Sequence, residues 1–160
     1  MASNTSSGPY ATFEADDQVA GDAAAYAERA VELARTRFNV TLDYSESSVP
    51  MLEQMARAVD RARAAGQIPD TQRPDRELGA PFGFYIGEVY RRNHGATWGF
   101  VNVEGQRIAG FQTSQGAIWW PLAKAGQRLR GDPSDNLAYY YHVVCHPDQG
   151  GQTRLPNGGK

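Results

Sequence analysis

Three glycines at four-residue spacing, Gly79, Gly83 and Gly87, restrict most strongly how this chain can fold. They lie in the segment GAPFGFYIGEVYRRNHG, whose apolar residues recur at helical spacing and which Gly95 is placed to end. A glycine inside a helix costs about 1 kcal/mol relative to alanine, so something must compensate. We expect this helix edge to pack closely against backbone or aromatic side chains. The alternative is a smooth groove that receives a ligand or a partner's chain.

The remaining periodicity predicts helices and strands on either side of this segment. One helix is expected at about residues 22–38 and a second after Pro50. The glycine segment forms a third that ends at Gly95, and two more begin at Pro121 and after Ser134. Strands are expected at 97–103, 107–112 and 118–120, with a hairpin turn at Glu104 and Gly105. We predict an α+β fold in which a small antiparallel sheet of three to four strands is covered by about five helices. Residues 1–160 should form one domain, with 1–9 and 147–160 flexible and 67–77 a loop.

The charge balance limits the kind of partner. The formal net charge is -2, which disfavours nucleic-acid binding through the cations of the second half: Arg91, Arg92, Lys124, Arg128 and Arg130. Residues 1–80 carry a net charge of -5 and residues 81–160 a net charge of +3. With a single cysteine, no secretion signal and no stretch as long as a membrane span, we expect a cytoplasmic protein that does not bind membranes.

No residue pattern announces catalysis or a cofactor. His142, Cys145 and His146 fall within about one helical turn and resemble a zinc-ligand set, but a closed site needs a fourth ligand and the remaining histidine is His94. The sequence shows no serine in a G-x-S-x-G elbow and no carboxylate pair placed for acid–base work. We therefore expect no metal, no cofactor and no catalytic residues, and predict that the protein is not an enzyme.

The aromatic and charged residues near the predicted sheet suggest a protein-binding surface instead. Trp119 and Trp120 are adjacent on one strand and must point to opposite faces, so one of them is covered by a helix or exposed as an anchor. Glu88 precedes Arg91 and Arg92 at the spacing of helical ion pairs, on what we expect to be a solvated face. The predicted partner-binding residues are Trp98, Trp119, Trp120, Arg91, Arg92, Lys124 and Glu88.

Two segments also resemble a known family. LDYSESSVPMLEQM at 42–55 and GFYIGEVYRRNHGATW at 83–98 are similar to a pattern of small uncharacterised bacterial proteins, across roughly residues 40–130. Some of those relatives are similar to immunity proteins encoded beside interbacterial toxins. The resemblance implies a non-enzymatic protein that neutralises a cognate toxin by binding it. The alternative is a small-ligand-binding protein or an unrecognised enzyme that uses the groove beside Gly83, Gly87 and Glu88.

Overall fold

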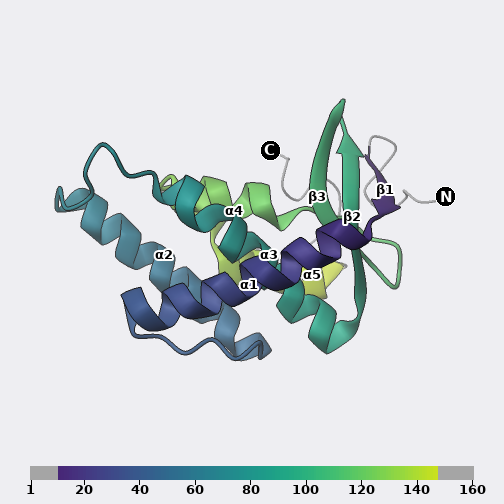
Figure 1. Ribbon diagram of the computed structural model, residues 1–160, viewed down its shortest axis with the longest axis horizontal. Coiled ribbons are helices and arrows are strands. Elements are labelled where there is room, and N and C mark those ends of the chain that lie inside the picture. Colours follow the sequence, from purple (N-terminus) through teal and green to yellow (C-terminus); the bar gives the residue numbers. More distant parts are fainter. Residues whose placement is uncertain (1–10, 148–160) are drawn as a thin grey trace.

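A computed structural model describes residues 11–147. It confirms the predicted α+β class, with the helices gathered beside one four-stranded sheet (Figure 1). Residues 1–9 and 148–160, which were predicted to be flexible, lie outside the described residues. The elements are β1 (Ala11–Ala15), α1 (Asp17–Phe38), η1 (Glu46–Ser48), α2 (Val49–Ala64), α3 (Pro74–His94), β2 (Ala96–Val103), β3 (Gln106–Thr113), β4 (Ile118–Trp119), α4 (Pro121–Leu129), η2 (Pro133–Asp135) and α5 (Leu137–Cys145).

Two helices begin earlier in the chain than their patterns predicted. Helix α1 starts at Asp17, because the carboxylate of Asp16 accepts hydrogen bonds from the backbone N–H groups of Gln18 and Val19 and so caps the first turn. Helix α3 starts at Pro74, so the second part of the expected 67–77 loop is helical. Proline suits a first helical turn, where its missing N–H would have had no partner. None of the helices in the described 11–147 region is long and apolar enough to cross a membrane.

The sheet is antiparallel throughout, in the order β1-β2-β3-β4. Strand β1 was not predicted. The register pairs Trp98 with Phe111 and Phe111 with Trp119, so these three rings share one face and join the main core beneath the helices. A smaller cluster of Ala11, Val101, Val103, Ile118 and Trp120 packs together elsewhere on the sheet. The alternation of Trp119 and Trp120 is thus confirmed, since the two rings join different clusters.

The glycine edge of α3 packs as expected. A Cβ atom at Gly83 would lie 2.6 Å from the Leu122 Cα atom, and one at Gly87 would collide with the Trp98 ring. At Gly79 the nearest atom would be the Cα atom of Gly126, at 3.7 Å. The edge therefore lies against the backbone of α4 at two positions and against an aromatic ring at the third. Within the described residues, these contacts fill the space directly over Gly83 and Gly87.

Candidate functional site

The expected tryptophan anchor is wrong. Trp98, Trp119 and Trp120 are 3%, 0% and 2% exposed, so none of the three rings is available to a partner. Lys124, expected at the rim of that surface, donates to the Asp135 carboxylate at 2.7 Å and is largely covered. Arg128, one of the cations considered for the disfavoured nucleic-acid binding, is 1% exposed and lies within the fold.

Glu88 is a buried structural carboxylate rather than part of a solvated face. It is 1% exposed and accepts from Arg91 at 2.7 and 3.0 Å, from Arg92 at 3.1 Å and from Trp98 Nε1 at 2.8 Å. Burial acts to raise its pKa, but the hydrogen bonds, that from Arg91 foremost, hold the pKa of Glu88 below its usual range. The predicted ion pairs with Arg91 and Arg92 are confirmed. Through its hydrogen bond with Trp98, the Glu88 carboxylate holds α3 against β2.

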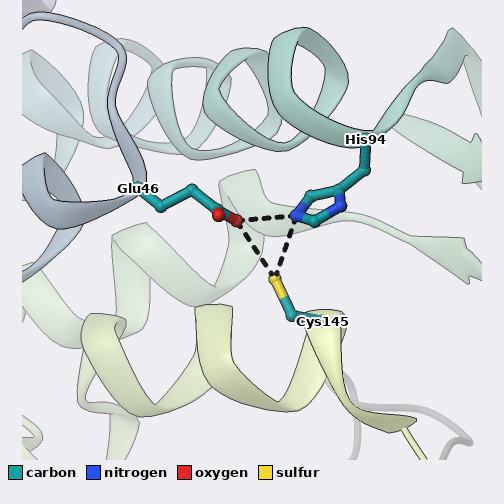
Figure 2. A group of neighbouring side chains, drawn as sticks. All are labelled: Glu46, His94 and Cys145. Atoms are coloured by element: carbon teal, nitrogen blue, oxygen red, sulfur yellow. Dashed lines mark hydrogen bonds and ion pairs between the residues drawn. The ribbon is translucent and has the colours of Figure 1, made fainter.

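A different group of side chains converges where η1, the end of α3 and α5 meet. Glu46, His94 and Cys145 place one oxygen, one nitrogen and one sulfur atom within 4.8 Å of one another (Figure 2). Glu46 Oε2 lies 2.6 Å from His94 Nε2 and 3.7 Å from Cys145 Sγ, and the sulfur lies 3.9 Å from His94 Nε2. Tyr141 donates its hydroxyl to the same Glu46 oxygen at 2.6 Å. Three segments far apart in the sequence thus meet at one carboxylate oxygen.

Local hydrogen bonds explain how Glu46 reaches this position. The Asp43 carboxylate accepts from the backbone N–H and the hydroxyl of Ser45, which closes a turn in front of η1. Tyr44 adopts a left-handed backbone conformation with φ 67°, and it donates its N–H to the Tyr85 hydroxyl on α3 at 2.8 Å. The turn is therefore pinned to α3, and η1 projects Glu46 toward the end of that helix.

His94 and Cys145 are placed by the ends of their helices. His94 is the last residue of α3, and its ring packs against that of Tyr90 with the centroids 4.8 Å apart. Asn93 donates to the backbone oxygen of Tyr44 at 3.1 Å, which ties this end of α3 to the turn before η1. Cys145 is the last residue of α5, one helical turn after Tyr141. The two helix ends and η1 thus fix the three side chains relative to one another.

Without a metal, the surroundings favour the ionised carboxylate of Glu46 and the protonated thiol of Cys145. The hydrogen bond from Tyr141, followed by that from His94, lowers the pKa of Glu46. Burial raises the pKa of Cys145 to about 11, so its thiolate form is scarce at neutral pH. A cysteine nucleophile would also need a histidine whose second nitrogen is held by an orienting group. Here Glu46 and Cys145 both approach the same nitrogen of His94, Nε2. The three side chains are therefore not arranged as a nucleophile, a base and an orienting group.

The donor set fits a tetrahedral transition metal. Zinc bound to nitrogen, oxygen and sulfur at about 2.0–2.3 Å holds neighbouring ligand atoms roughly 3.3–3.6 Å apart. The two sulfur separations, 3.7 and 3.9 Å, are close to that range, while the 2.6 Å between Glu46 and His94 is a hydrogen-bond distance. Opening that pair by less than about 1 Å would admit an ion. Both side chains are at least 40% exposed, so they have room to move.

The sequence grouped the wrong residues around Cys145. Its neighbours in the sequence, His142 on α5 and His146 just after that helix, are not in the convergent set. Their rings lie against each other, tilted by 30°, with centroids 4.5 Å apart. The cysteine instead meets His94 and Glu46, which are 51 and 99 residues away. Glu46 was not predicted at all. The one available signal was that Glu46 and His94 both fall within the two segments that resemble the bacterial family.

Glu46, His94 and Cys145 lie at the edge of a pocket of about 350 Å³. It is lined by Glu46, Val49, Pro50, His94, Ala138, Tyr141, His142, Cys145 and His146. Another hollow, of about 330 Å³, lies beside Glu88 and Arg91 where α1 approaches β2, but the carboxylate there is already saturated with donors. The pocket at Glu46 therefore combines open volume with a carboxylate, an imidazole and a thiol that converge at its edge.

Tyr85 and Tyr140 give a matched test of the turn that carries Glu46. The Tyr85 hydroxyl accepts from Tyr44 N–H and shares a 2.7 Å hydrogen bond with Ser48, so Tyr85→Phe should lower the free energy of unfolding by about 1–3 kcal/mol. The buried Tyr140 hydroxyl has no partner among the described residues, so Tyr140→Phe should cost nothing. Chemical denaturation of both variants measures the difference. Equal losses would show that the Tyr85 hydrogen bonds do not support the turn.

Comparison with known proteins shows which fold this chain shares with a solved structure, but it does not indicate an activity. No protein-family model matches the chain, and no curated protein matches it in sequence. A crystal structure of a protein from Bacteroides thetaiotaomicron VPI-5482 is similar to it, with a TM-score of 0.58 and 14% sequence identity. The match covers 92% of this chain and 52% of that one, so this chain spans about half the length of the similar structure. At this identity the similarity establishes a shared fold alone.

Proposed function

We propose that the protein binds a transition-metal ion, with zinc the best match, through Glu46, His94 and Cys145. One observation carries the proposal: a carboxylate, an imidazole and a thiol from three separate segments converge within 4.8 Å at the edge of an open pocket. Thiolate and imidazole are ligands that zinc favours, and three protein ligands with one open position are usual for zinc sites that are not purely structural. This proposal replaces our expectation that the protein holds no metal.

Removing single ligands tests the proposal directly. Titration of the purified protein with Zn²⁺ against a chromophoric chelator should give one equivalent bound. Cys145→Ser and His94→Ala should each weaken binding by at least about 100-fold, since loss even of an outer hydrogen-bond partner costs 10–100-fold. Thermal unfolding without metal would establish that both variants are folded.

His142→Ala is the matched control for these variants. His142 lies on the same helix as Cys145 and lines the same pocket, but it does not belong to the convergent set. Its removal should leave zinc affinity nearly unchanged. Weakening by His142→Ala with no weakening by His94→Ala would assign the metal to His142 instead, and stoichiometric binding in the absence of Cys145 and His94 would refute the proposed ligand set.

The toxin-neutralising role implied by the family resemblance stays a prediction. Its proposed anchors are buried, and its charged rim is engaged in internal ion pairs, because Arg91 and Arg92 bind Glu88 and Lys124 binds Asp135. A protein partner would therefore need other contacts. Exposed rings such as Tyr26 and Tyr139, which are 43% and 61% exposed, are available for that purpose.

A further inference from the structure

The proposed metal set leaves one coordination position that no other residue of the described 11–147 region fills. Zinc in such sites is four-coordinate, and Glu46, His94 and Cys145 supply three ligands. Their ligand atoms lie at a pocket of about 350 Å³, within the usual range for pockets that hold small molecules. A small exogenous ligand can therefore reach the metal without displacing a protein side chain.

The walls of the pocket differ in chemistry from its metal-binding end. Val49, Pro50 and Ala138 contribute aliphatic surface where the start of α2 faces α5. His142 and His146 contribute imidazole rings, which can donate hydrogen bonds to an oxygen atom. The pocket thus combines potential metal ligands, hydrogen-bond donors and an apolar wall within one small volume.

We infer that this pocket binds a small monocarboxylate with a short alkyl chain. The carboxylate would bind through the metal ion proposed above, on whose presence it depends, and the chain would lie on Val49, Pro50 and Ala138. Thiolate and carboxylate ligands together neutralise a divalent ion, so a single further negative charge is tolerable where a di- or trianion would be disfavoured. The apolar wall then distinguishes a longer acid from acetate.

Cobalt in place of zinc gives separate signals for the metal and for its exogenous ligand. Co²⁺ bound to Cys145 produces thiolate charge-transfer absorption, while its visible ligand-field bands respond to a new fourth ligand. Butanoate should change the ligand-field bands saturably, and it should bind about 15-fold more tightly than acetate, because it has two more CH₂ groups and each buried CH₂ contributes about fourfold. Butylamine, which has four carbon atoms but no carboxylate, should not compete.

Ala138→Gln tests the apolar wall without touching a metal ligand. Ala138 is partly exposed, so the longer side chain can be accommodated while it fills the space for an alkyl chain. The variant should keep the thiolate–cobalt absorption and lose the preference for butanoate over acetate. Intact charge-transfer absorption with no response to either acid, or with equal affinity for both, would overturn the carboxylate inference alone. Absence of the charge-transfer absorption in the unmodified protein would overturn the metal site and the inference with it.

Discussion

Replacing Glu53 with alanine should lower the free energy of unfolding by about 3–5 kcal/mol, because the change leaves a buried guanidinium without its main partner. Glu53 is 5% exposed and accepts from Arg128, which is 1% exposed, at 2.9–3.1 Å. It also accepts from the backbone N–H of Leu137 at 2.9 Å, which starts α5. One carboxylate thus holds α2, α4 and α5 together. Without it, the acidic partner that Arg128 would keep among the described residues is Asp60, at 2.9 Å.

Glu32→Ala is the control for this loss. Glu32 pairs with Arg35 at 2.9 Å on α1, but both side chains are more than half exposed, so solvent screens the pair and its loss should cost at most about 1 kcal/mol. Urea denaturation of the two variants compares a buried with an exposed ion pair. If Glu53→Ala were no more destabilised than Glu32→Ala, the buried network would not be a support of the fold.

Periodic sequence patterns predicted the packing faces of the helices well. Leu137, Tyr140, Tyr141 and Val144, which recur at helical spacing on the last helix, are all buried. The glycine spacing likewise predicted a close contact along α3. These features depend on residues within one turn of each other, so a local pattern contains the information needed to find them.

Features set by long-range pairing were missed. Strand β1 has five residues, too few for a convincing alternation, and it exists because it pairs with β2 more than eighty residues later. Glu53, Glu88 and Arg128 are buried because they meet partners on other elements. Helical spacing does not record those partners, so it suggests that such charged residues face solvent. The Glu46–His94–Cys145 set depends on three segments meeting, and no spacing within the chain records that meeting.

The glycines of α3 should respond differently to the same small substitution. At Gly79 a Cβ atom meets Gly126 at an ordinary 3.7 Å, so Gly79→Ala should raise the free energy of unfolding by up to about 1 kcal/mol through better helix propensity. Gly21, in α1 with nothing within 4 Å of an added Cβ, should behave like Gly79. These two variants set the baseline for an alanine in a helix of this protein.

Gly83→Ala should instead lower the free energy of unfolding by about 1–3 kcal/mol. Its Cβ atom would lie 2.6 Å from the Cα atom and 2.9 Å from the backbone nitrogen of Leu122. A backbone contact of this kind cannot be relieved by a rotamer change, so α4 must move away from α3 and loosen the core between them. Thermal or urea unfolding of Gly79→Ala and Gly83→Ala measures the contrast. Equal stabilities would mean that α4 can shift freely, and the close approach of the two helices would then not explain why α3 carries glycine at this position.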